Sequence, residues 1–408
     1  MSPIRLIAGV CTAQVLVQIG AFSVPALLPT LIAEWSMTNT EAGWVTGIFY
    51  LGYTVSVPVL VSLTDRVDPK RVYLFGLALV AVSAAGFALM ADDFWTACLF
   101  RTIWGIGWAG TYMPGLKALS DLIEGPRQSR AVAVHAASIG ISGAASFVIA
   151  ETVAVWLDWR WAILLGAAGA ALAFAVMAVV LPRRKPTPPE DGHAGLLDFR
   201  PVLRNKSALA YSLCYCVHTW EMSALRSWVV TFLAFTAVHT GATVGVFTPA
   251  TIATSLGLIG VWASVSGNEV AIRFGRRNFI FGVFLASMAM ACGIGFTSGV
   301  SYALAAGLSI VYAGLIWADS SSLTAGTVGS AEPGRRGATM AVHSALGYFG
   351  GFLGPLALGA ILDLAGGASP AGWGIAFVHV AVILLVGPLA LLILRPKGLA
   401  GDRPEPFG

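Results

Sequence analysis

Long apolar stretches alternate with short polar ones along nearly the whole chain. Each stretch holds about 20 residues or more, the length that an α-helix needs to cross a hydrocarbon core of about 30 Å. The pattern therefore predicts an all-α membrane protein with 12 transmembrane helices. The predicted segments are 6–33, 42–64, 72–91, 95–120, 131–157, 160–182, 207–236, 244–271, 278–298, 301–325, 337–364 and 372–394.

The longest polar interval separates the sixth apolar segment from the seventh. It runs from Arg183 to Lys206 and is rich in proline, glycine and charge, a composition typical of a solvated linker. We therefore predict an N-terminal six-helix bundle over 1–182, a cytoplasmic linker over 183–206, and a C-terminal six-helix bundle with a short tail over 207–408.

Composition agrees with a membrane protein. Of the 408 residues, 57% are hydrophobic and only 11% are charged, whereas soluble domains carry about 25% charged residues. The five cysteines lie inside apolar segments without metal-ligand spacing, so we expect neither a metal site nor disulfides. The sequence shows no glycine-rich phosphate loop followed by Lys-Ser/Thr and no catalytic triad. We therefore expect no ATP-driven transport, no enzymatic activity and no cofactor.

The basic residues indicate how the chain is oriented. With the N-terminus in the cytoplasm, all but four of the 24 lysines and arginines fall in cytoplasmic segments, as the positive-inside rule requires. An even number of helices then places both termini in the cytoplasm. We expect a monomeric, multi-pass protein of the cell inner membrane whose partners are the lipid bilayer, a small-molecule substrate and protons, without nucleic acid.

The two predicted halves repeat each other. The stretch from Glu124 to His135 can be laid on the stretch from Glu332 to His343, with the acid, an arginine, Ala-Val and the histidine all coinciding. Asp65-Arg66 and the basic residues after it correspond to Ile272-Arg273 and its basic residues at almost the same separation. Repeated halves are a common design of transporters.

These motifs resemble the major facilitator superfamily along essentially the whole chain. That family has a Gly-x-x-x-Asp-Arg-x-Gly-Arg-Lys-type signature between helices 2 and 3, and here Val61 and Asp68 replace its two glycines. Helix 4 adds Arg101 followed by Gly105, Gly107 and Gly110, as is frequent in the family. The resemblance implies two six-helix bundles related by a pseudo-twofold axis along the membrane normal.

In the family, the charges of this signature form cytoplasmic latches that hold the halves together when the protein opens outward. The resemblance therefore implies a latch role for the matching residues and, less closely, for their second-half copy, where Ile272 stands in place of the acid; the alternative is that these cations only enforce the topology. The residues are Asp65, Arg66, Lys70, Arg71, Arg273, Arg276 and Arg277.

Polar residues within the apolar segments are candidates for the functional site, because charge at mid-membrane depth is costly and calls for a partner or a function. They concentrate on helices 1, 4, 7 and 10, which line the cavity in the resembled family. The candidates for substrate binding or proton coupling are Gln14, Gln18, Arg101, Tyr112, Lys117, His218, Trp220, Glu221, Arg226, Tyr312 and Asp319. Glu221 lies on one helical stripe with His218 and is the first candidate for the proton carrier.

The mixture of cations and titratable groups favours a secondary active transporter that takes up a small anionic or zwitterionic organic solute with protons. Two alternatives stay open. One is export of a drug or metabolite in exchange for protons, although the glycine- and proline-rich motif of drug exchangers is missing from helix 5. The other is a membrane sensor that transports nothing.

Overall fold

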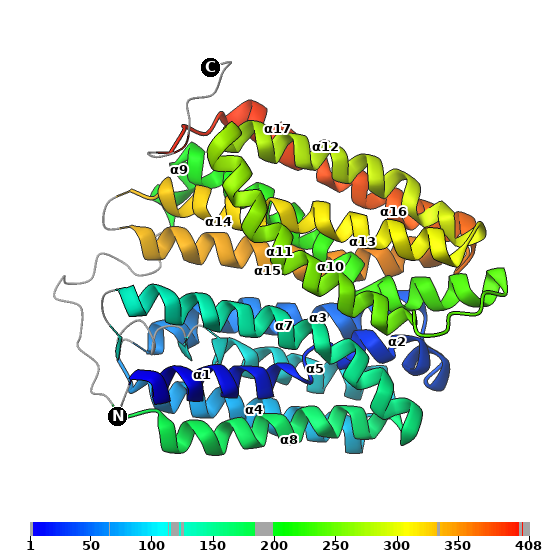
Figure 1. The fold of residues 1–408 in the computed structure, drawn as a ribbon, viewed down its shortest axis with the longest axis horizontal. Coiled ribbons are helices and arrows are strands. Elements are labelled where there is room, and N and C mark those ends of the chain that lie inside the picture. The colour runs from blue at the N-terminus through cyan, green and yellow to red at the C-terminus, as the bar shows by residue number, and fades with distance from the viewer. Residues whose placement is uncertain are drawn as a thin grey trace. The chain divides into compact units, whose positions relative to one another are not determined.

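The computed structural model describes residues 3–64, 66–112, 114–115, 122–123, 126–183, 199–332, 335–399 and 402. Among these residues the secondary structure is helical and contains no strand, which confirms the predicted all-α class (Figure 1). Two predicted site residues, Asp65 and Lys117, and most of the predicted linker lie outside the described residues.

Contacts divide the chain into two compact units. Unit 1 comprises Met1–Met37 and Ile48–Gly192, and unit 2 comprises Thr38–Gly47 and His193–Gly408. The first turns of α3 thus belong to unit 2, and the helix continues into unit 1. The predicted boundary at the linker does not anticipate this exchange, because sequence patterns record where helices begin and not which neighbours they contact.

The helices of unit 1 follow the apolar segments of the first half. They are α1 Pro3–Gln18, α2 Ser23–Glu34, α3 Asn39–Leu63, α4 Pro69–Met90, α5 Phe94–Ala109, α7 Pro126–Trp156 and α8 Trp159–Val180.

Small residues let the helices of unit 1 pack closely. α8 packs along both α1 and α4. A Cβ atom added at Gly166 of α8 would lie 2.7 Å from the Cα atom of Gly20, so a larger residue there would force the two backbones apart. Close approach at small residues is a general feature of helix packing in membranes.

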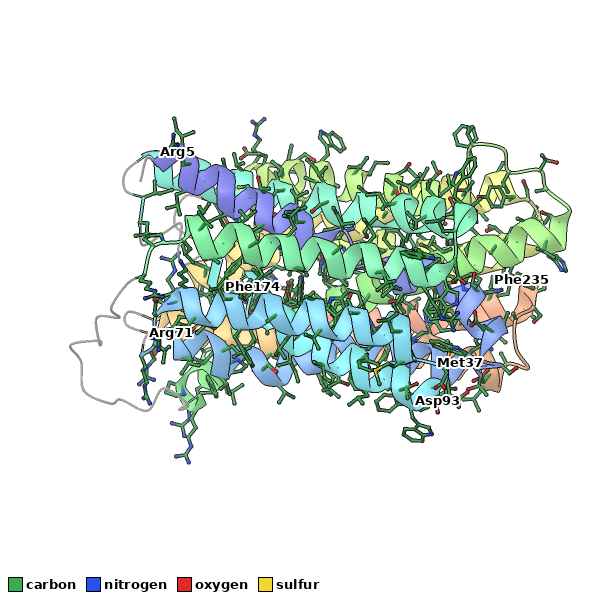
Figure 2. All side chains as sticks on the ribbon, turned by 90° about the horizontal axis from the view of Figure 1, so that it is seen from below. Arg5, Met37, Arg71, Asp93, Phe174 and Phe235 are labelled. Atoms are coloured by element: carbon green, nitrogen blue, oxygen red, sulfur yellow. The ribbon has the colours of Figure 1, made fainter. Side chains whose placement is uncertain are left out.

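The two ends of unit 1 differ in charge. Figure 2 shows Arg5 and Arg71 at one end and Met37 and Asp93 at the other. At the second end Asp93 caps α5: its carboxylate accepts a hydrogen bond from the backbone N–H of Thr96 at 2.7 Å. The hydrogen bonds from Thr96 hold the pKa of Asp93 below its ordinary value.

The helices of unit 2 are more often interrupted. They are α9 Arg200–Arg204, α10 Lys206–Thr240, α11 Pro249–Phe274, α12 Arg276–Ile294, the 3₁₀ turn η1 Gly295–Gly299, α13 Tyr302–Ala318, α14 Ser320–Gly329, α15 Arg336–Leu364, α16 Pro370–Leu384 and α17 Val386–Leu394. The longest helix, α10, packs along α15, whose Gly350 and Gly354 lie against the α10 carbonyls of Cys216 and Trp220.

Each of the 12 predicted segments coincides with a helix or with two successive helices. Among the described residues, four of the predicted continuous helices are broken: 6–33 at residues 19–22, 95–120 after Ala109, 301–325 at Asp319 and 372–394 at Leu385. In the described part of the chain, nine helical segments are long and apolar enough to cross a membrane. α10 is not among them, because polar and charged residues occupy its middle, and this is where the candidate site lies.

Candidate functional site

The middle of α10 carries two titratable side chains that are almost completely buried. His218 is 1% exposed and Glu221 is 2% exposed. The helical stripe expected from the spacing is buried along its whole length: Cys214, His218, Glu221, Leu225 and Trp228. Such groups within a membrane protein require partners, because burial of an unpaired charge is costly.

Asp319 supplies the partner of His218. The carboxylate is 2% exposed, and its Oδ1 lies 2.8 Å from His218 Nδ1. The oxygen lies off the line of the ring N–H, so the contact has the distance of an ion pair without the alignment of a hydrogen bond. At this distance the two groups attract each other when the imidazole is protonated and the carboxylate is ionised.

The break between α13 and α14 explains why Asp319 is available. Asp319 is the C-cap residue of α13 and also the N-cap residue of α14. An aspartate at the start of a helix commonly accepts hydrogen bonds from the first backbone N–H groups. Here the side chain makes no capping hydrogen bond, and the carboxylate lies instead against His218 of α10.

Glu221 extends the cluster by one turn of α10. Its carboxyl group lies close to Tyr312, Ser287 and Asp319, but in the described part of the chain the hydroxyl groups of Tyr312 and Ser287 form no hydrogen bond. Its Oε1 atom has no hydrogen-bond partner in the described part of the chain. The cluster therefore brings together two carboxyl groups and one imidazole, and the charge on each depends on whether its neighbours hold a proton.

Arg226 and Trp220 lie near this cluster in sequence but have other partners. The Arg226 guanidinium stands over the ring of Trp317 with 5.0 Å between its Cζ atom and the ring centroid, an attractive cation–π arrangement. Trp220 donates from its ring N–H to His379 Nε2 at 3.4 Å. Among the described residues no ion pair joins Arg226 to Glu221.

The candidates of unit 1 form neutral or aromatic contacts. Trp108 donates to Gln18 Oε1 at 3.0 Å, and Arg101, 2% exposed, stands 4.6 Å over Phe49. Gln14 is completely buried, and in the described part of the chain neither atom of its amide finds a partner. Tyr112 stacks on His135 with 5.9 Å between the ring centroids.

The structure also reveals members of the site that the sequence reasoning did not select. Ser287 lies beside Glu221, and Tyr215 of α10 stacks on both His218 and His343. His343 carried a signal in the sequence, since it is the repeated histidine of the Ala-Val-His motif. Tyr215 lies one turn before His218 on the same helix. A serine such as Ser287 carried no comparable signal.

The residues of the predicted latch lie at helix ends. Arg66, Arg71 and Arg273 are exposed and Arg277 is half-buried. Lys70 donates from Nζ to the carbonyl oxygen of Ala178 at 2.6 Å.

Arg276 differs from the other latch residues because it is buried. It binds Asp402 of the C-terminal tail with two hydrogen bonds of 2.9 Å and donates to Asn268 at 2.9 Å.

Comparisons with known proteins show which proteins this chain resembles. The family model described as Major Facilitator Superfamily matches residues 10–331. Protein spinster homolog 1 of Bos taurus is 25% identical over 248 residues, 58% of this chain and 47% of its own length. The Niacin transporter NiaP of Acinetobacter baylyi is 23% identical over 154 residues, 38% of this chain and 35% of its own length.

Among solved structures, a bacterial homolog of the human lysosomal transporter Spinster, in an inward-facing and occupied conformation, superposes with a TM-score of 0.78 at 16% identity. The superposition covers 100% of both chains. The chain spans about half the length of the curated spinster relatives it matches.

Proposed function

Because the chain belongs to the Major Facilitator Superfamily, we propose that it is a secondary active transporter that works by alternating access and couples the movement of a small organic solute to protons. The proteins it resembles are transporters and not enzymes, which confirms the expectation that the chain is not an enzyme. Coupling to protons and the class of solute rest on the site in unit 2.

The observation that carries the proposal is the buried contact between His218 and Asp319, 2.8 Å apart. With Asp319 ionised and His218 protonated, the two charges stabilise each other. Loss of one proton leaves a single buried negative charge beside Glu221, which is unfavourable in a poorly solvated interior. The cluster therefore favours rebinding of a proton. That proton comes from whichever side of the membrane the cluster is open to.

Glu221 is the group we assign to the coupling step. It is buried, its Oε1 atom has no partner among the described residues, and it senses the charge of Asp319. Burial favours its neutral form, and opening to water favours its ionised form. A carboxyl group that alternates between these environments can bind a proton on one side of the membrane and release it on the other.

Anionic or zwitterionic solutes fit this site best. Arg226 lies five residues after Glu221 on α10, is half-buried, and stands over the ring of Trp317. A guanidinium is well suited to bind a carboxylate. The similarity to a protein called a niacin transporter supports the same class, since niacin is a small carboxylic acid.

The experiment uses purified protein in proteoliposomes. A thermal-shift panel of small carboxylates and amino acids, nicotinate included, first identifies a solute that stabilises the protein. Uptake of that radiolabelled solute is then measured with the pH gradient set in either direction. Symport predicts accumulation when the outside is acidic. Accumulation only when the inside is acidic would indicate exchange of solute for protons, and insensitivity to the gradient would refute proton coupling.

Asp319→Asn and His218→Gln provide the site-specific test. Both substitutions keep the side-chain size and remove one charge of the pair. We expect both to abolish the effect of the pH gradient on uptake, whereas Thr236→Val, on the same helix α10, removes a neutral hydrogen bond and keeps the response to the gradient. If Asp319→Asn responds to the gradient as the wild type does, the proton site lies elsewhere.

A further inference from the structure

His343 is a second buried histidine of unit 2, besides His218. Its contacts differ from those of His135, the residue at the corresponding position of the first half. His343 lies about two turns from the start of α15 and is 2% exposed. Its Nδ1 lies 3.0 Å from the Thr327 hydroxyl and its Nε2 lies 3.4 Å from the Thr324 hydroxyl, both from α14. Each ring nitrogen thus faces a hydroxyl group.

A hydroxyl partner can satisfy a ring nitrogen with or without a proton. The Thr327 and Thr324 hydroxyls also lie within hydrogen-bond distance of the carbonyl oxygens of Leu323 and Ser320, at 3.1 and 3.3 Å. When a ring nitrogen carries a proton, the threonine oxygen accepts from it and donates its own proton to the carbonyl. When the nitrogen is bare, the hydroxyl turns and donates to the ring. Both protonation states of His343 are therefore hydrogen-bonded.

The repeat partner, His135, lacks this arrangement. It is completely buried, and neither of its ring nitrogens has a hydrogen-bond partner among the described residues. The repeat that pairs His135 with His343 also pairs Leu116 and Leu119 with Thr324 and Thr327. Leucine can neither donate nor accept a hydrogen bond, so the sequence of the first half does not repeat the two hydroxyl groups.

His343 is also linked to the proton site proposed above. The ring of Tyr215 is nearly parallel to both imidazoles, with centroid distances of 4.0 Å to His343 and 5.6 Å to His218. The two imidazoles are therefore within about 10 Å of each other, close enough for the charge on one to disfavour charge on the other. Tyr215 precedes His218 by one turn, so His343 lies nearer the end of α10 that we predict to be cytoplasmic.

The other elements packed against α15 bring few titratable groups. α14 contributes the two threonines and has Asp319 at its cap. His379 of α16 contacts Trp220 and its own helix carbonyl of Ala376. The short helix α9 carries Arg200 and Arg204 near the start of α10. Among these described groups, His218 is the one that Tyr215 links to His343.

From these contacts we propose that His343 is a second proton-binding group, which exchanges one proton with the His218–Asp319 pair. In the transfer an N–H bond of His218 breaks, an N–H bond forms on His343 through an intervening hydroxyl or water, and the positive charge moves with the proton. The two threonines hold the proton on His343, and mutual repulsion prevents both histidines from being charged at once. This inference rests on the proposed proton coupling.

Solid-state NMR of ¹⁵N-histidine-labelled protein in lipid vesicles tests the proposal without a known solute. Neutral and doubly protonated rings give distinct nitrogen signals, and His343→Asn identifies the signal of His343 among the six histidines. We expect this signal to change from neutral to doubly protonated as the pH is lowered stepwise from about 8 through the range in which the protein stays folded. A His343 that stays neutral throughout overturns the proposal.

Two variants test the parts of the argument separately. Thr324→Val with Thr327→Val removes both hydroxyls at nearly constant volume and should lower the proton affinity of His343 about tenfold, the effect of one unit of pKa. His218→Gln removes the competing charge and should raise that affinity. An unchanged titration in the threonine variant refutes the role of the hydroxyls, and an unchanged titration in His218→Gln refutes the exchange.

His135→Asn is the matched control, since it changes the repeat partner and should leave the titration of His343 as in the wild type. A shift of similar size in this variant would mean that the signal reports a general loosening and would also refute the proposal. The outcome is separable from that of the proposed function. If Asp319→Asn abolishes proton-coupled uptake while His343 never titrates, the transporter mechanism stands and only this second site falls.

Discussion

Asp363, near the end of α15, accepts four hydrogen bonds from the first turn of α3. Its Oδ1 accepts from the backbone N–H and the side-chain amide of Asn39 at 3.1 and 2.7 Å. Its Oδ2 accepts from the backbone N–H and the hydroxyl of Thr40 at 2.7 and 2.6 Å. The carboxylate therefore caps a helix that begins more than 300 residues earlier in the chain, within unit 2.

Asp363→Asn removes the charge and turns one oxygen into an NH₂ group that faces two donors. At least two of the four hydrogen bonds are then lost. A hydrogen bond to a charged group contributes about 1.5–3 kcal/mol, and partial exposure of Asp363 to solvent reduces this value. We therefore expect a loss of about 2 kcal/mol, which corresponds to a fall in the unfolding midpoint of about 5 °C for a unit of this size.

The assay is thermal unfolding in detergent at one scan rate, followed by tryptophan fluorescence. Glu41→Gln is the matched control, because Glu41 lies in the same turn and its carboxylate accepts hydrogen bonds from the backbone N–H and the hydroxyl of the neighbouring Thr38, at 2.8 and 3.0 Å and exposed to water. We expect a shift below about 1 kcal/mol there. Equal midpoints for Asp363→Asn and Glu41→Gln would refute the reasoning.

Three further predictions concern helix ends. Asp93→Ala should lower the unfolding midpoint at pH 7 but not near pH 2. The hydrogen bonds from Thr96 lower the pKa of Asp93 in the folded protein. The stabilisation from the ionised carboxylate is therefore present above the ordinary carboxyl pKa and is lost as the pH falls through the pKa of the folded protein. Asp402→Ala should lower the midpoint by about 8–12 °C, because loss of one partner of a buried ion pair costs about 3–5 kcal/mol and leaves Arg276 without its acid, and an unchanged midpoint would contradict this role of the tail. Arg66→Ala should slow solute transport in proteoliposomes while expression is retained, and wild-type rates would leave Arg66 only a role in topology.

Much of the fold could be predicted from the sequence, because helix length and hydropathy follow directly from the thickness of the bilayer. The interruption at Asp319 could not be predicted, since an aspartate in an apolar segment is compatible with a continuous helix. The exchange of Thr38–Gly47 into unit 2 depends on Asp363, far away in the chain.

The candidate site was predicted in its residues but not in its pairing. His218, Glu221 and Asp319 were selected because charge is costly within a membrane. Spacing along α10 links His218 to Glu221, whereas the contact between His218 and Asp319 joins two helices and requires their packing. His343 becomes a candidate because threonines of α14 lie beside its ring nitrogens. These threonines have no distinguishing signal in the sequence.

The most direct test of the account measures whether protons move with the solute and whether Glu221 carries them. Wild type and Glu221→Gln are reconstituted in vesicles that contain a pH-sensitive dye, and the solute selected by the thermal-shift panel is added outside. The account predicts that the solute acidifies the lumen with the wild type. With Glu221→Gln it should give no acidification yet still exchange for labelled solute inside, since exchange requires no net proton movement. Equal acidification by the two proteins, or solute uptake by the wild type without any, would contradict the account.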